Sequence, residues 1–156
     1  MDNLKKKALN CNVDIRFIGD RVSHSRGMRD GRKVYSIWDS YVYADFVTYP
    51  SIWEGFGNQL IEAVFAKLPI VAFEYPVYVS DLKGKGFDIV SLGYTYKKNN
   101  DLVYIDRSIL KCACSRVMEM LINKELTVKA VESNYNIAKE NFSFKALEGI
   151  LKGLGL

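Results

Sequence analysis

Two carboxylates on either side of a glycine-containing turn are the residues of this 156-residue chain best suited to do chemistry. Glu54 and Glu62 lie eight positions apart, and Gly55 and Gly57 lie between them. Because glycine has no Cβ, the backbone there can approach a ligand closely and donate N–H groups to phosphate or hydroxyl oxygens. Each carboxylate can accept two hydroxyl hydrogen bonds from a vicinal diol. The layout suits a ligand with a diol at each end, such as a nucleotide-sugar.

The segments around this turn predict a strand, a loop and a helix, in that order. In the segment 45–49, the residues after Asp45 are β-branched or aromatic like a buried strand, and Asn58 can cap a helix whose apolar residues have helical spacing. Such a unit directs the loop and the helix N-terminus to the carboxyl edge of a parallel sheet, where open α/β sheets bind ligands. Spacing alone leaves an alternative open, in which Glu54 is an ordinary loop acid and the helix dipole favours Glu62.

The residues from Pro50 to Ala63 carry a resemblance to a known family. They read Pro-Ser-x-x-Glu-Gly-Phe-Gly-x-x-x-x-Glu-Ala, and Pro69-Ile70-Val71-Ala72 follows. This pattern resembles the donor-site signature of retaining GT-B glycosyltransferases of family four. The resemblance implies an α/β fold, a Rossmann-like open parallel sheet with helices on both faces, as the C-terminal half of a GT-B enzyme. It also implies transfer of a sugar from a nucleotide diphosphate donor to a hydroxyl acceptor, with no cofactor and no metal.

The resemblance assigns roles residue by residue. Glu54 would hold the sugar hydroxyls at the catalytic centre, and Glu62 would bind the ribose diol. Backbone N–H groups facing the sugar or phosphate would come from Gly55, Phe56, Gly57 and Asn58. The base would lie near Gly19 and Asp20, which follow the segment 13–18.

The resemblance covers most of the chain but not the whole family architecture. In the family, the active site lies between two domains, and an Arg and a Lys near the start of the donor half bind the diphosphate. Residues 1–156 are therefore predicted to be one donor-binding domain that lacks its first strand and the N-terminal acceptor half. Two alternatives stay open: a nucleotide-sugar binding module that is inactive on its own, and a GT-B sugar-nucleotide epimerase.

Composition excludes several other classes. The net charge of +4 is mild, and 49% hydrophobic with 26% charged residues is ordinary for a globular domain, so nucleic acid is not an expected partner. No apolar run is long enough for a membrane span and no secretion signal is present, which predicts a cytoplasmic location. Cys11, Cys112 and Cys114 do not have metal-site spacing and are expected to be reduced. The lone His24 lacks the Gly-x-Ser-x-Gly partner of a serine hydrolase.

Further elements follow from periodicity. Strands are expected at 13–17, 46–49, 70–73 and 87–92, and 19–32 is expected to be an irregular loop. Apolar stripes predict helices between about 107 and 123 and between 128 and 142. A last helix, capped by Ser143, is expected to turn four residues inward: Leu147, Ile150, Leu151 and Leu154. Loss of a strand from a wound sheet would expose apolar surface, so the chain is expected to self-associate or to be marginally stable.

Overall fold

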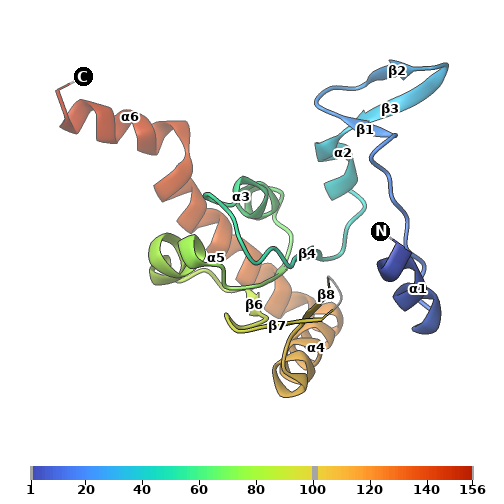
Figure 1. Ribbon diagram of the computed structural model, residues 1–156. Coiled ribbons are helices and arrows are strands. Elements are labelled where there is room, and N and C mark those ends of the chain that lie inside the picture. Colours follow the sequence, from blue (N-terminus) through green and yellow to red (C-terminus); the bar gives the residue numbers. More distant parts are fainter. Residues whose placement is uncertain (1, 100–101, 156) are drawn as a thin grey trace. The chain divides into compact units, whose positions relative to one another are not determined.

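The computed structural model describes residues 2–99 and 102–155 (Figure 1). The chain divides into two compact units, which are treated separately below. One comprises Met1–Tyr43 with Lys98–Tyr104 and is called the N-terminal unit. The other comprises Ala44–Lys97 with Ile105–Leu156 and is called the sheet unit.

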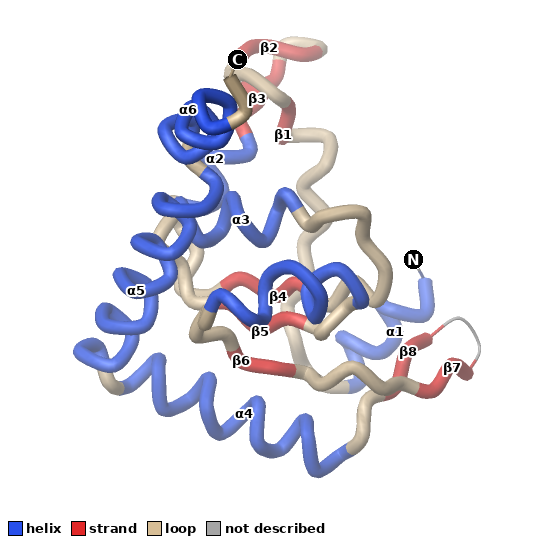
Figure 2. The backbone as a smooth tube through the Cα atoms, turned by 90° about the vertical axis from the view of Figure 1, so that its left-hand side faces the viewer, coloured by secondary structure: helices blue, strands red, loops and turns tan. Residues whose placement is uncertain are grey.

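A parallel sheet forms the centre of the sheet unit. Its strands are β4 (Val47–Tyr49), β5 (Ile70–Ala72) and β6 (Val90–Ser91), with β5 in the middle (Figure 2). Their carboxyl ends are in register, because Tyr49 pairs with Ala72 and Ala72 pairs with Ser91. β5 is buried along its whole length, which explains why its sequence is continuously apolar.

Helices connect and cover these strands. Between β4 and β5 the chain forms α3 (Asn58–Phe65), and after β5 it forms the short π-helical turn η1 (Tyr78–Leu82) and the 3₁₀ turn η2 (Lys83–Lys85). α4 (Arg107–Ile122) packs on β6, and α5 (Lys124–Phe142) packs on α3 and α4. The predicted α/β class with a parallel sheet is thus confirmed, as are strands near 46–49 and 70–73 and helices near 107–123 and 128–142.

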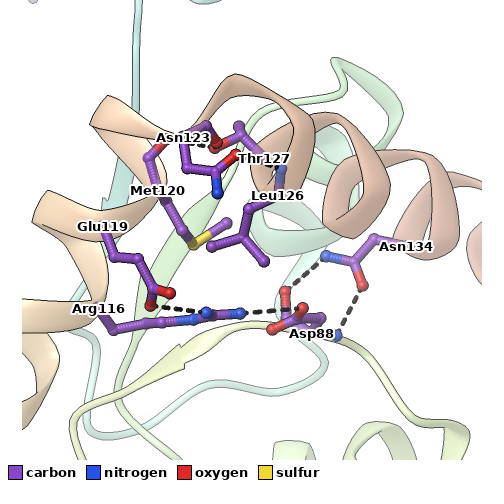
Figure 3. Close-up of polar contacts among 8 residues, drawn as sticks. All are labelled: Asp88, Arg116, Glu119, Met120, Asn123, Leu126, Thr127 and Asn134. Carbon is purple, nitrogen blue, oxygen red and sulfur yellow. Dashed lines mark hydrogen bonds and ion pairs between the residues drawn. The ribbon is translucent and has the colours of Figure 1, made fainter.

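A buried asparagine joins α5 to the sheet. Asn134 is 1% exposed, and its side chain makes two hydrogen bonds to the backbone of Asp88, just before β6 (Figure 3). The Asp88 N–H donates to Asn134 Oδ1 at 2.7 Å, and Asn134 Nδ2 donates to the Asp88 carbonyl at 2.8 Å. The Asp88 carboxylate lies 3.5 Å from the guanidinium of Arg116 on α4. One loop residue therefore holds both long helices in place.

The N-terminal unit contains a small sheet and two helices. α1 (Asp2–Asn10) is followed by β1 (Val22–Ser23), β2 (Gly27–Arg29), β3 (Arg32–Ser36) and α2 (Ile37–Tyr41). β3 lies between β1, which is parallel to it, and β2, which is antiparallel. A separate two-stranded sheet is formed by β7 (Lys97–Asn99) and β8 (Leu102–Tyr104).

Two predictions for the N-terminal unit were wrong. Residues 13–17 are not a strand; they have no sheet partner, and the Phe17 ring instead lies under the Lys5 ammonium at 5.5 Å. The segment 19–32 is not an irregular loop, because it contains β1, β2 and the turn into β3. That turn is Asp30-Gly31, with φ of +50° and +72°, the conformation that Asp-Gly favours in two-residue hairpins. In the sequence, this Asp-Gly dipeptide is the feature that indicates the hairpin.

The last helix also differs from expectation. α6 (Phe144–Gly153) begins after Ser143, whose hydroxyl accepts from the Ala146 N–H at 3.1 Å, so the predicted cap is confirmed. Its apolar residues do not turn inward, however, and none of its residues is buried. Exposed fractions are 51% for Leu147, 58% for Ile150, 38% for Leu151 and 71% for Leu154. α6 packs mainly against α5. Within the described residues, no other element packs extensively on its apolar stripe.

Asn134→Ala is expected to destabilise the fold by about 1–3 kcal/mol, because it removes both hydrogen bonds between the buried Asn134 side chain and the backbone of Asp88. Urea unfolding followed by circular dichroism measures the change. Asn136→Ala, two positions along α5 at an exposed site, is the matched control and should be nearly neutral. Equal midpoints for the two variants would refute the proposed clamp.

Candidate functional site

Polar and aromatic residues follow each parallel strand at the carboxyl edge of the sheet. The loop of residues 50–57 follows β4, Glu74 and Tyr75 follow β5, and Ser91 ends β6. Because the three strands are parallel and in register, these residues meet at one edge. This edge contains the site residues predicted between Glu54 and Asn58.

A buried tyrosine fixes the shape of the loop. Tyr75 is fully buried, and its hydroxyl donates to the Phe56 carbonyl at 2.9 Å. Gly57 has φ of +94°, and a Cβ built there would lie 1.9 Å from the Tyr75 hydroxyl oxygen. Two features therefore require glycine at position 57: the left-handed backbone and the closeness of the Tyr75 ring. Gly55 has neither constraint, since a Cβ there would have no atom within 4 Å.

The start of α3 differs from the prediction in one detail. Gly57, and not Asn58, is the N-cap residue, and Asn58 is the first residue of the helix. The left-handed backbone that Tyr75 imposes at Gly57 places the cap there, and its carbonyl accepts from the Leu60 N–H at 2.9 Å. Since Gly57 has no side chain, no side-chain cap covers the first amides of α3. An α-helix start of this kind favours an anion.

Glu54 lies against the hydroxyl groups of two tyrosines. It is half-buried and lies near the Tyr49 hydroxyl, which donates to Gln59 Oε1 at 3.4 Å. Burial and the nearby carboxylate of Glu54 raise the pKa of Tyr49 above its ordinary value. Burial and the same charge raise the pKa of Tyr75 to about 12. Both phenols are therefore neutral at physiological pH, and no second charge lies beside Glu54 on that side.

The other predicted residues of this loop and helix have distinct environments. The Phe56 ring packs edge-on against Phe142 at the end of α5, with ring centroids 5.6 Å apart, so its side chain is structural. Glu62 lies one turn into α3 and is half-buried, next to the buried Ile61 and Ala63. Its exposure is compatible with contact to a ligand, as the sequence predicted.

Gly19 and Asp20 lie in the N-terminal unit. Both are exposed, and Asp20 lines a cavity of about 300 Å³ together with Arg29, Asp30 and Arg32. Close by in sequence, Arg26 forms a bidentate ion pair with Asp39. The hydrogen bonds from Arg26 hold the pKa of Asp39 well below its usual range, although desolvation opposes this. The base-binding role predicted for Gly19 and Asp20 stays a prediction.

Sequence reasoning missed a polar network built on Glu74. Glu74 Oε2 accepts from Lys83 Nζ at 2.8 Å, and Oε1 accepts from Ser91 Oγ at 2.7 Å. Ser91 Oγ in turn accepts from the Gly93 N–H at 2.9 Å. Burial opposes ionisation of Glu74, but the hydrogen bonds and the charge of Lys83 outweigh it and hold its pKa below the ordinary value. The position of Glu74 just after β5 was the available signal.

The remaining titratable groups give no sign of a metal centre. Among residues 2–99 and 102–155, no group of three or more His, Cys, Asp or Glu side chains could hold a metal ion. The three cysteines are free and exposed. In the same ranges, no helix has the length and apolar character needed to cross a membrane.

Known proteins similar to this chain are enzymes of sugar transfer. The mannosylglucosylglycerate synthase of Thermotoga maritima is 40% identical over 151 residues, which cover 97% of this chain and 34% of that protein. The mannosylglucosylglycerate synthase of Petrotoga mobilis is 34% identical over 145 residues, which cover 91% of this chain and 33% of that protein. The chain thus spans about a third of the length of the curated relatives it matches. No family model matches, and no solved structure matches.

These relatives are glycosyltransferases, and the chain resembles one region of them along nearly its whole length. The predicted transferase relationship is therefore supported at that coarse level. The family-four and GT-B assignment, and the roles of the individual site residues, stay predictions.

Gly57→Ala is expected to destabilise the sheet unit by on the order of 2 kcal/mol or more, because it strains a left-handed backbone and collides with Tyr75. Gly55→Ala is the matched control, two positions away in the same loop, and should change stability by about 0.5 kcal/mol or less. Urea unfolding of both variants measures the difference. Similar stabilities would show that Tyr75 does not fix the loop.

Ionisation of Glu74 should stabilise the fold in a defined pH range. Its folded-state pKa is depressed below the ordinary 4.5, so the stabilisation is complete above that value and is lost as pH falls through the folded-state pKa. The melting temperature of the wild type should therefore fall more steeply below about pH 4.5 than that of Glu74→Gln. Glu148→Gln removes an exposed carboxylate paired with Lys152 and should keep the wild-type slope. Parallel curves for wild type and Glu74→Gln would contradict this.

Proposed function

We propose that this chain is the donor-binding region of a glycosyltransferase that uses a nucleotide diphosphate sugar. The observation that carries the proposal is the 40% identity, over 97% of the chain, to a mannosylglucosylglycerate synthase. The proposal extends to transfer onto a hydroxyl acceptor with retention of the anomeric configuration, as the sequence between Pro50 and Ala63 suggests. The rest of the enzyme, about two thirds of the length of the relatives, would supply the acceptor site.

The loop after β4 supports this proposal by its chemistry. Glu54 is an acceptor for sugar hydroxyls, and its carboxylate lies near the Tyr49 hydroxyl at the end of β4. The start of α3, capped only by Gly57, offers amide N–H groups to the diphosphate. A sugar phosphate bound here would place its sugar hydroxyls at the Glu54 carboxylate and its phosphate at the N–H groups that start α3. Glu62, one helical turn further on, would receive the ribose diol.

The proposed catalysis is electrostatic. In transfer from a nucleotide-sugar, negative charge develops on the departing diphosphate, and prearranged N–H groups at the start of α3 would stabilise it. Glu54 would fix the orientation of the sugar ring, so that the acceptor hydroxyl attacks in a defined geometry. The name of the relatives' product contains mannosyl, glucosyl and glycerate units. Activated mannose and activated glucose are therefore the donors to test first.

Binding of nucleotide-sugars to this chain should depend on both carboxylates. Glu54→Gln and Glu62→Gln keep the side-chain size and remove the charge, which should weaken binding by about 10- to 150-fold, equivalent to 1.5–3 kcal/mol. Isothermal titration calorimetry with GDP-mannose, UDP-glucose and ADP-glucose measures the effect. Glu62→Gln should also weaken the free nucleotide, whereas Glu54→Gln should act only when the sugar is present.

Glu140→Gln, at an exposed position on α5, is the matched control and should bind like the wild type. Transfer is then tested on a chimaera that joins this chain to the remaining part of the Thermotoga maritima relative, with NMR of the early product to read the anomeric configuration. Equal transfer by wild-type, Glu54→Gln and Glu62→Gln chimaeras would overturn the assigned roles. A free sugar formed without an acceptor product would instead favour the epimerase alternative.

A further inference from the structure

A second polar and aromatic cavity lies in the sheet unit, beside the loop described above. Its volume is about 660 Å³, within the range of small-molecule sites. Residues of the 50–57 loop line one part, and residues that follow β5 and β6 line the rest. Glu54, Glu62 and the amides of α3 are not part of its lining. The cavity is thus a feature that the proposed donor contacts do not use.

One wall of the cavity is aromatic and exposed. Trp53 is 77% exposed and Tyr94 is 70% exposed, so neither ring is needed to fill the core. Tyr96 also lines the cavity, but its ring packs against Phe73 with centroids 5.7 Å apart. Exposed Trp and Tyr rings offer a flat apolar face together with a polar group, a combination enriched where proteins bind ligands.

The polar wall is the network of Glu74 and Lys83. Glu74 is 9% exposed, and each of its oxygens already accepts one hydrogen bond, from Lys83 and from Ser91. A carboxylate has about four acceptor positions, so two are still available. The Lys83 side chain is 52% exposed and uses one of its three N–H donors on Glu74. Donors and acceptors are therefore side by side and held in fixed positions.

The charge of this wall selects between ligand classes. The positive charge of Lys83 is matched by the negative charge of Glu74 at 2.8 Å, so the wall has little net charge to attract an anion. A phosphate or a carboxylate that accepts from the remaining N–H donors of Lys83 would lie beside the negative charge of Glu74 and be repelled by it. A neutral ligand with several hydroxyl groups can instead donate to Glu74 and accept from Lys83 without breaking the pair.

We propose that this cavity binds a neutral sugar ring, which lies against Trp53 and Tyr94 and exchanges hydroxyl hydrogen bonds with Glu74 and Lys83. The inference deepens the proposed function and rests on it, because it adds a sugar site to a transferase region. The sugar has two possible sources, the donor or the acceptor. Trp53 is adjacent to Glu54 in the chain, so a ring in the cavity lies next to the loop that would hold the donor.

The test uses simple glycosides as probes of the cavity alone. Methyl mannoside and methyl glucoside, without nucleotide, are added to the chain, and saturation-transfer NMR detects which ring protons touch the protein. In a Trp38→Phe background Trp53 is the remaining tryptophan, so its fluorescence should respond to the same titration. Millimolar binding is expected, and glucuronate, which keeps the sugar ring and adds a carboxylate, should bind more weakly than the neutral glycosides.

Variants then connect this binding to the cavity. Tyr94→Ala and Lys83→Met should each weaken glycoside binding by about fivefold or more, because each removes one wall of the site. Phe144→Ala is the matched control: it deletes a 92% exposed aromatic ring on α6 and should bind like the wild type. Melting temperatures identify any variant that fails to fold, and Trp53→Ala, judged by NMR, replaces it. Unchanged binding in the folded cavity variants, or glucuronate binding as tightly as the glycosides, would overturn the proposal.

Separate readouts keep this inference apart from the proposed function. If nucleotides do not bind in calorimetry but glycosides bind the cavity, the donor role fails and the sugar site stands. If nucleotide-sugars bind and glycosides do not, the sugar site fails and the donor role stands. Where both bind, displacement of the glycoside by a nucleotide-sugar but not by the nucleotide diphosphate identifies the cavity as the place of the donor sugar. Simultaneous binding identifies it as the place of the acceptor sugar.

Discussion

The hydrogen bond from the Tyr75 hydroxyl to the Phe56 carbonyl is the contact on which the candidate site depends. A phenol that is completely buried needs a partner, and leaving it unpaired would cost about 1–3 kcal/mol. The partner is a backbone carbonyl of the loop after β4, so the loop must lie close above the ring. That closeness excludes a Cβ at Gly57, and the left-handed backbone at Gly57 in turn sets where α3 begins. One side chain after β5 therefore determines the geometry of the preceding loop and helix.

The same arrangement organises the charges at the sheet edge. Two carboxylates follow adjacent strands, Glu54 after β4 and Glu74 after β5, and their surroundings differ. Glu54 lies near two tyrosine hydroxyls whose pKa values are raised, so these neighbours are neutral. Glu74 is paired with Lys83 and Ser91, so its charge is balanced. Glu54 is therefore suited to forming new hydrogen bonds when a ligand binds. Glu74 is suited to keeping one polar surface in place.

The sequence predicted those parts of the fold that local rules determine. β-Branched runs located β4 and β5, helical periodicity located α3, α4 and α5, and Ser143 identified the start of α6. The errors have physical causes. The alternation at 13–17 indicates a strand only if another strand pairs with it, and the Asn58 cap was displaced by a tertiary contact from Tyr75. The Asp30-Gly31 turn was a local signal that was overlooked.

Side-chain contacts between distant residues lay beyond the sequence. Nothing in the neighbourhood of Asn134 shows that it pairs with the backbone of Asp88, 46 positions earlier. Likewise, Glu74 and Ser91 become neighbours only because β5 and β6 are parallel and in register. The spacing of Glu54 and Glu62, by contrast, could be recognised because one short loop and one helix contain both.

α6 shows what a periodic pattern does and does not determine. Its apolar residues are spaced as on one face of a helix, and the structure places them on such a face, yet that face is exposed in the described chain. An apolar stripe with helical spacing indicates a face that packs against another surface. It does not identify the element that provides that surface. The chain spans about a third of the length of its relatives, so the covering surface need not be within these residues. The inward direction predicted for α6 was wrong because helical spacing defines an apolar face but supplies no surface for it to pack on.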